Sequence, residues 1–541
     1  MAGTGQYYDP ADCDAAWRRP APKARAAAMA LYTWRDPGLS FVISMAAAFP
    51  FVIAALLAPA LLSFAPTVDI LAPIADARAM AAGSVSVVAK SSPFHLALLL
   101  AGDLFYDAPG RIHLAAKAFA AIIIVAPFAY FGSARFALAQ TALMTAALAA
   151  FITAPFSGAN EIGLAYFVAL ATALLAEPAD ESRMRGVIEG ALAGAILFCL
   201  WLSNPLFALL GFLALSACPF LTGRSGLFRY GAALFVMVAL VGISELLAPG
   251  LTAARATAAS GALAGVAHAR LGVGAWGLAG VAASTAIVIF AAAVFGGAEH
   301  WKGWAGALGL VILAVGAARV VGAQPQLVFA LAAAIAAFSV ASPFYDGVFR
   351  YHDRASVAIA GSAAALTLFW TAAVIVQAAG QVSLQYRTAS SSSAANIRAE
   401  LGLVQPGGPT IAKWIEEGRF STPEARDLFA LAPIDQSAML LEAADRARAL
   451  TKEGFHVAIL TQADTACVIA DDRKCSADGR AAAEKAKIVF VPRIDFDAAT
   501  AVIKGRSEAL LYTEFRKVEE TPLWEIWVRR GVNPPGLNAP K

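Results

Sequence analysis

Charged residues are scarce in this chain. Asp, Glu, Lys and Arg make up 15% of its 541 residues, against about 25% in an average soluble protein. Hydrophobic residues make up 59%, and the mean hydropathy is +0.66. This composition excludes an ordinary soluble protein and predicts a protein embedded in a membrane.

The chain also lacks an excess of either charge, since its net charge is only +3. A small net charge gives no sign of a polyanion-binding surface, so we expect no nucleic-acid partner. The Gly-rich run GVGAWGLAG, at 272–280, lacks the strand and helix that flank a nucleotide-binding turn. A soluble nucleotide-sugar site is therefore not expected.

Long apolar runs dominate instead. Crossing a bilayer takes about 17 to 25 apolar residues. About eleven runs meet this length, which predicts a polytopic α-helical membrane protein: 39–63, 113–131, 136–154, 161–177, 187–203, 205–221, 230–248, 274–295, 304–321, 325–342 and 355–380.

Basic residues set the expected orientation. Arg18 and Arg19 precede the first span and place the N-terminus in the cytoplasm, because Lys and Arg are retained on that side. The Ala/Gly-rich segment 249–273 is a loop, an interfacial helix or a further span, and these alternatives stay open. If it crosses, every later segment inverts.

The composition changes after the last apolar run, where a Ser/Ala linker leads into a charged C-terminal region of about 150 residues, enough for its own core. With an odd number of spans this region lies outside the cytoplasm, in the periplasm of a bacterium whose inner membrane holds the chain. The expected organisation is a cytoplasmic segment 1–38, a transmembrane domain 39–380 with an outer loop 64–112, a linker 381–396 and a soluble α/β domain 397–541.

The patterns in the C-terminal domain predict alternating helices and strands. The expected helices are 411–420, 423–432 and 436–454, and the expected strands are 456–460, 466–470, 487–493, 509–520 and 523–530. Trp414, Trp524 and Trp527 either stack on sugar rings or form the core of this domain.

Two cysteines give an independent indication of the compartment. Cys467 and Cys475 flank a short polar loop, as a disulfide in an oxidising compartment would. The alternative is a pair of free thiols. A zinc site is not expected, because His456 is the only histidine in the domain.

The polar stretch 68–114 carries the most distinctive residues of the chain. It is too polar to cross a bilayer, yet two parts of it, 73–84 and 91–106, have the composition of amphipathic helices. It contains a carboxylate, a lysine and an arginine that we expect at one membrane face: Asp76, Lys90 and Arg111.

This stretch resembles the first extracytoplasmic loop of GT-C superfamily membrane glycosyltransferases, in the branch of aminoarabinose transferases and protein O-mannosyltransferases. The residues that carry the resemblance are Asp76, Ala77, Arg78, Ala79 and Met80, then Lys90, Pro93, Phe94 and His95, and finally Leu104, Phe105 and Arg111. The chain departs from that pattern at Ala77, where the family has a second acid, at Ser91 and Ser92, which separate Lys90 from the proline, and at His95, near the family's tyrosine.

The resemblance implies a GT-C-like fold and an enzyme that moves a sugar from a polyprenyl-phosphate donor to a lipid, glycan or protein acceptor outside the cytoplasm. Asp76 would be the general base, with Asp69 as the second choice. Lys90, His95 and Arg111 would face the donor, and Glu161 and Glu245 would line the cavity or simply lie at the interface. A role for a divalent cation stays open.

Two other classes of protein fit the same composition. A transporter or flippase of a lipid-linked or small substrate would show paired repeats with broken spans, and no such repeats are visible. A membrane assembly protein without chemistry would use its outer domain to bind a partner.

Overall fold

The structure is a computed structural model that describes 37–61, 68–84, 91–134, 138–154, 183–268 and 433–470, most of 475–534, and isolated positions between these ranges. Contacts group the chain into two compact units. The first comprises Met1–Val52, Ala121–Ile243 and Gly261–Val376, and the second comprises Ile53–Ala120, Ser244–Ser260 and Gln377–Lys541.

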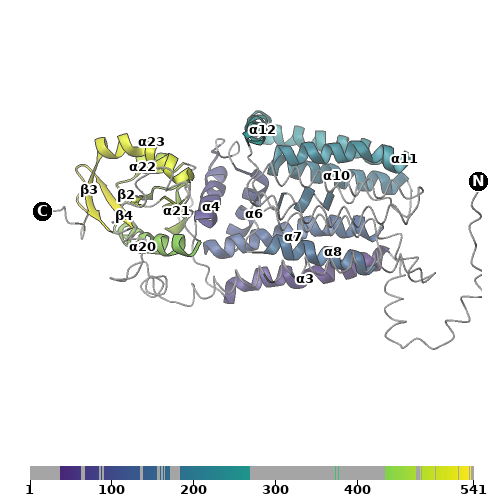
Figure 1. The fold of residues 1–541 in the computed structure, drawn as a ribbon, viewed down its shortest axis with the longest axis horizontal. Coiled ribbons are helices and arrows are strands. Elements are labelled where there is room, and N and C mark those ends of the chain that lie inside the picture. The colour runs from purple at the N-terminus through teal and green to yellow at the C-terminus, as the bar shows by residue number, and fades with distance from the viewer. Residues whose placement is uncertain are drawn as a thin grey trace, which may run out of the picture. The chain divides into compact units, whose positions relative to one another are not determined.

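Long apolar helices make up most of the described N-terminal half (Figure 1). They are α3 (Pro37–Leu61), α7 (Pro109–Ser133), α8 (Leu138–Thr153), α10 (Arg183–Ser203) and α11 (Pro205–Leu247). Four described segments are long and apolar enough to cross a membrane: Pro37–Leu57, Pro109–Ser133, Arg183–Ser203 and Gly226–Leu247. The expected spans at 274–295, 304–321, 325–342 and 355–380, and most of 161–177, lie outside the described residues.

The exposed face of α11 is apolar. The side chains of Phe235, Val238 and Leu246 are 75%, 69% and 84% exposed. A soluble protein rarely leaves such a run of large apolar side chains in water, whereas lipid covers it without cost. The described helices thus support the prediction of a membrane-embedded chain.

The chain reverses its direction within α11. Near the start of α11, Gly211 lies against Leu197 of α10, whereas further along Arg229 lies against Gly190 and Ala233 against Gly194. At roughly 1.5 Å per residue, a straight helix would carry Arg229 about 37 Å from Asn204, while Gly190 lies about 21 Å from it. The first part of α11 therefore runs antiparallel to α10 and the later part parallel to it, as two separate spans at 205–221 and 230–248 would.

A buried ion cluster joins α10 to the later part of α11. The Glu189 carboxylate is fully buried, and its two oxygens lie 3.0 Å from Arg185 Nε and 2.8 Å from Arg229 Nε. Arg229 is 1% exposed. Ionised groups inside a bundle are costly unless they are paired, and this carboxylate has two guanidinium partners.

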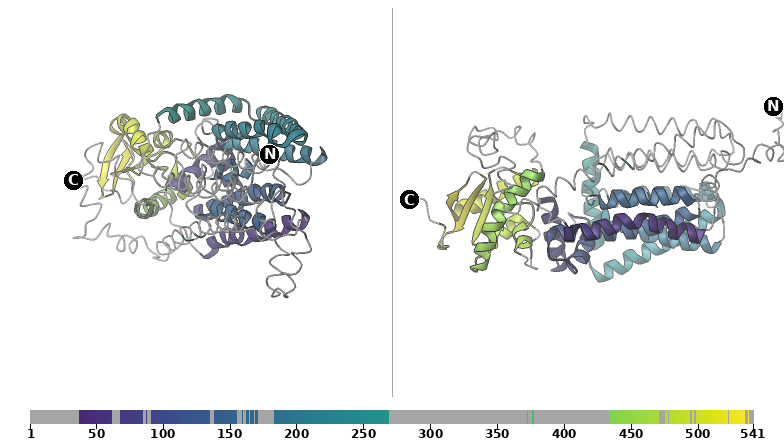
Figure 2. Two further views of the ribbon diagram at one scale, coloured as in Figure 1. Left: turned by 45° about the vertical axis from the view of Figure 1, so that its right-hand side comes forward. Right: turned by 90° about the horizontal axis from the view of Figure 1, so that it is seen from below.

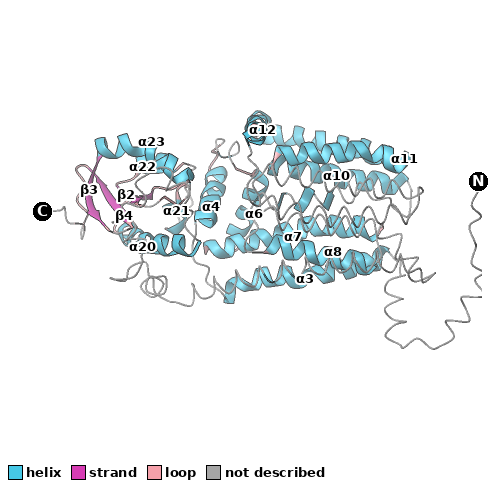
Figure 3. Cartoon of the chain, viewed as in Figure 1, coloured by secondary structure: helices cyan, strands magenta, loops and turns pink. Residues whose placement is uncertain are grey.

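The C-terminal region contains the four strands of the described residues (Figure 3). They are β1 (Val457–Ile459), β2 (Ile488–Pro492), β3 (Phe515–Glu520) and β4 (Trp524–Arg529). The sheet order is β1-β2-β4-β3, with β1 parallel to β2 and the other two pairs antiparallel. The accompanying helices are α20 (Pro433–Lys452), α21 (Thr465–Ile469), α22 (Gly479–Lys485) and α23 (Ala498–Glu514).

Helices cover both faces of this sheet (Figures 1 and 2). Val489, Val491 and Trp527 form a core with α22 and α23 on one face. Trp524 points to the opposite face, where its indole N–H donates to the Met439 carbonyl of α20 at 3.2 Å. Alternating strand positions therefore serve two cores.

One expected strand was wrong and another was wrong in part. The segment 466–469 belongs to the short helix α21, with Ala470 as its C-cap, and the N-cap is Asp464, whose carboxylate accepts from the Cys467 N–H. The segment 509–514 ends helix α23, and β3 begins only at Phe515. Short apolar runs do not distinguish buried strands from buried helices, which explains both errors. The expected helices 411–420 and 423–432, with Trp414, lie outside the described residues.

The expected disulfide is present. Cys467 in α21 is bonded to Cys475, with their Cα atoms 5.4 Å apart.

Candidate functional site

The described residues of the polar stretch 68–114 form helices that belong to the same unit as the C-terminal sheet. These are α4 (Val68–Ala81), α6 (Pro93–Asp103) and the start of α7, and α4 packs against α6. Helix α4 ends where Gly83 adopts a φ of +91°, a conformation that favours glycine. Helix α6 begins with Ser92 as its N-cap and Pro93 in its first turn.

Asp76 lies half-buried on α4 and contacts the start of α6. Its Oδ2 atom accepts a hydrogen bond of 2.6 Å from the Ser91 hydroxyl. Hydrogen bonds to an ionised acceptor are stronger than neutral ones, so Ser91 fixes the position of this carboxylate.

Arg255 places a cation beside the same serine. It comes from α12 (Leu251–His268), and its guanidinium donates to the Ser91 carbonyl at 3.2 Å. Burial lowers the pKa of Arg255 to about 10, so it stays charged at neutral pH. Ser91 therefore contacts both an anion and a cation. No sequence pattern connects Arg255 with Asp76, because 164 residues separate Arg255 from Ser91.

A buried ion pair connects α4 to the end of α6. Arg78 donates from Nε and from a terminal nitrogen to the two oxygens of Asp103, at 3.3 and 2.8 Å. The side chains are 2% and 5% exposed. This bidentate ion pair holds α4, the helix that carries Asp76, in one orientation relative to α6. Asp103 was not predicted, and its one signal in the sequence is that it ends an otherwise apolar helix.

Two histidines and a lysine gather where α6 meets α7. The rings of His95 and His113 are 6.4 Å apart and edge-on, and neither Nδ1 atom has a hydrogen-bond partner among the described residues. Lys117 is fully buried on α7. Burial, and secondly the charge of Lys117, lower the pKa of His95 to about 4, so its imidazole is neutral at pH 7.

The structure describes two of the remaining predicted residues and leaves two others outside its description. Asp69 lies in the first turn of α4, and Arg111 is exposed in the first turn of α7. Lys90 and Glu161 lie outside the described residues.

Glu245 has a local structural role. Its carboxylate accepts from the backbone N–H groups of Gly250 and Thr252, at 2.7 and 2.8 Å, and from the Thr252 hydroxyl at 2.6 Å. It thereby caps the start of α12. The open segment 249–273 is thus helical over Leu251–His268, and α12 is not among the described helices that are apolar enough to cross a membrane.

The described residues hold no group of three or more His, Cys, Asp and Glu placed to bind a metal ion. No family model, curated protein or solved structure matches the chain. Its function therefore has to be inferred from the site itself.

Proposed function

We propose that the chain is a membrane glycosyltransferase that moves a sugar from a polyprenyl-phosphate donor to an acceptor outside the cytoplasm, with Asp76 as the general base. The observation that carries the proposal is the contact of Asp76 with the Ser91 hydroxyl, beside the buried cation Arg255. A carboxylate held next to a hydroxyl and a guanidinium has the parts that such a transfer requires.

In the proposed step, the acceptor hydroxyl oxygen attacks the anomeric carbon of the donor sugar. The bond from that carbon to the lipid phosphate oxygen breaks, and its electron pair leaves with the phosphate. The acceptor proton passes to Asp76, and a nearby cation offsets the charge on the departing phosphate. Arg255 is a described cation that contacts the same serine as Asp76, and Lys90 and Arg111 remain candidates from the sequence.

The proposed orientation places the N-terminus in the cytoplasm and the C-terminal region in the periplasm. The disulfide between Cys467 and Cys475 supports this side, because such bonds persist in oxidising compartments. The resemblance of 68–114 to the GT-C loop, with Asp76 and Arg78 in corresponding positions, supports the same arrangement.

The test reconstitutes the purified protein in vesicles with polyprenyl-phosphate donors that carry labelled hexose, pentose or aminosugar. A transferase passes label from a donor to an acceptor extract of the cell envelope and leaves free polyprenyl phosphate. Movement of an intact donor across the bilayer with no transfer of label would contradict the proposal and favour a flippase.

A further inference from the structure

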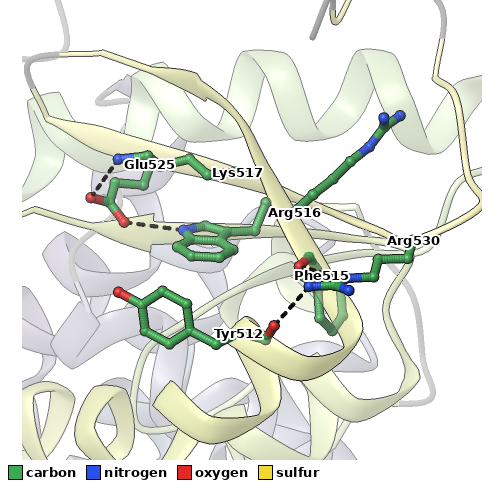
Figure 4. Close-up of a pocket in the computed structure, with 7 residues that line it drawn as sticks. Tyr512, Phe515, Arg516, Lys517, Glu525 and Arg530 are labelled. Carbon is green, nitrogen blue, oxygen red and sulfur yellow. Dashed lines mark hydrogen bonds and ion pairs between the residues drawn. The ribbon is translucent and has the colours of Figure 1, made fainter. Parts of the chain in front are cut away.

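A pocket of about 560 Å³ lies on the C-terminal region, where α23 meets the β3–β4 hairpin (Figure 4). The pocket lies on the C-terminal sheet, and none of its lining residues belongs to the Asp76 site. Aromatic and charged side chains line it together, and those that matter below are Tyr512, Lys517, Glu525, Trp527 and Arg530. A concave site with a few convergent polar groups is the usual form of a small-ligand site.

The aromatic part of the pocket is a fixed and exposed ring. Tyr512 is 62% exposed, and its ring meets the ring of Trp527 edge-on, with centroids 5.3 Å apart and planes at 89°. Trp527 is 7% exposed and belongs to the core, so it anchors the tyrosine from one side. The open side of Tyr512 offers a flat apolar surface with a hydroxyl at its end (Figure 4).

The polar part alternates acceptors and donors. The Glu525 carboxylate accepts from the Trp527 indole N–H at 3.1 Å and lies 3.6 Å from Lys517 Nζ. Lys517 also donates to Glu520 at 2.8 Å, and this hydrogen bond is the main reason that the pKa of Lys517 is raised. A carboxylate and an ammonium side by side match neighbouring sugar hydroxyls, each of which both donates and accepts.

One guanidinium group, that of Arg530, adds positive charge to the pocket. Arg530 donates to the carbonyls of Tyr512 and Phe515, at 3.0 and 3.4 Å. Both acceptors are neutral, so these bonds position the cation without cancelling its charge. Arg516 borders the pocket, but its guanidinium points away from Tyr512 and Glu525 and donates to the Asn533 side-chain oxygen and the Val532 carbonyl (Figure 4). The pocket therefore favours a ligand that carries a carboxylate.

We infer that this pocket binds an acidic saccharide: the ring stacks on Tyr512, hydroxyls bond to Glu525 and Lys517, and the acid group faces Arg530. This goes beyond the proposed transfer reaction and does not depend on it. Trp524, which lies in the core against α20, takes no part in it.

The experiment measures binding to the full-length protein in lipid nanodiscs by calorimetry, with trigalacturonic acid as the acidic probe and maltotriose as the neutral one. We expect saturable binding of trigalacturonic acid, weaker binding of maltotriose, and weakening of the first by salt. Tyr512→Ala should weaken trigalacturonic acid binding about tenfold, whereas Tyr512→Phe should keep most of it. Val502→Ala, at a half-exposed position of the same helix, is the matched control and should bind like the wild type.

Should Tyr512→Ala fail to fold, Glu525→Gln tests the polar contact instead. We expect Glu525→Gln to bind trigalacturonic acid about tenfold more weakly than the wild type, since one charged acceptor is lost. The inference is overturned if neither probe binds, if maltotriose binds more tightly, or if Tyr512→Ala and Glu525→Gln bind like the wild type. Asp76→Asn should bind trigalacturonic acid normally, so failure of the proposed reaction and failure of this inference give different results.

Discussion

Two charged side chains of the candidate site have partners that lie far away in the sequence. Arg78 and Asp103 are 25 residues apart, and Asp76 and Ser91 are 15 apart. The sequence singled out Asp76 and Arg78 through their position in a polar loop and through a family resemblance. It could not supply Asp103, Ser91 or Arg255, because their roles depend on how α4, α6 and α12 pack.

The buried ion cluster on α10 gives a prediction at this scale. Glu189→Gln removes the negative charge that lies 2.8 Å from the buried Arg229 guanidinium, which should lower the free energy of unfolding by about 3 to 5 kcal/mol. Unfolding of the purified protein in mixed micelles with increasing SDS measures the change. Met184→Ala, at an exposed position on the same helix, is the control. Equal unfolding midpoints for Glu189→Gln and the wild type would contradict a stabilising role.

His95 gives a prediction about pH. Its pKa falls from the ordinary 6.5 to about 4 on folding, so below pH 6.5 the unfolded chain binds more protons than the folded one. Its contribution to stability is therefore complete above pH 6.5 and is lost progressively down to about pH 4. Lowering the pH from 7 to 5 should lower the melting temperature of both proteins. We expect the decrease to be a few degrees smaller for His95→Gln than for the wild type. An identical drop in both proteins would show that His95 does not titrate this way.

At the scale of elements, apolar periodicity predicted the helices well and the strands less well. The expected spans at 113–131, 187–203 and 205–221 fall on α7, α10 and the first part of α11, because an apolar run of that length has few alternatives to a helix. The runs 466–470 and 509–514 were ambiguous, since five or six residues fit a strand as well as a helix. The cap at Asp464 was the signal that could have resolved the first of them.

Close packing between helices α10 and α11 depends on glycine. A Cβ atom on Gly194 would lie 3.0 Å from the Cα atom of Ala233, whereas a Cβ atom on Gly231 would meet nothing within 4 Å. Gly194→Val should therefore destabilise the protein by about 1 to 3 kcal/mol more than Gly231→Val, since both carry the same helix-propensity change but only one forces the helices apart. SDS unfolding of the two variants measures the difference. Equal loss in both would contradict the packing.

The disulfide acts on an element that touches the candidate site. Helix α21 contains Cys467 and packs against α4, the helix of Asp76. Replacing both cysteines by serine should lower stability by about 2 to 3 kcal/mol, the value expected for closing a short loop. Melting of the wild type with and without a reductant checks this, and the double variant should be insensitive to the reductant. A wild type that melts at the same temperature under both conditions would rule out a stabilising bond.

At the scale of the whole molecule, composition and hydrophobic patterns predicted a membrane-embedded chain with a mixed α/β C-terminal region, and the described residues show long apolar helices and a small C-terminal sheet with helices. The sequence did not predict that contacts would group the polar loop, α12 and the C-terminal sheet into one unit. That grouping depends on pairs such as Arg255 with Ser91 and α21 with α4, which no local pattern encodes. It brings the proposed catalytic carboxylate and the C-terminal region into one compact body.

The central claim is that Asp76 takes a proton from an acceptor during sugar transfer. The most direct test is single-turnover transfer from a polyprenyl-phosphate sugar by wild type, Asp76→Asn and the exposed control Asp107→Asn, at equal donor occupancy in nanodiscs. We predict that Asp76→Asn binds the donor normally but transfers at least about 100-fold more slowly, the usual loss for a general base, while Asp107→Asn matches the wild type. Transfer by Asp76→Asn at the wild-type rate would contradict the account.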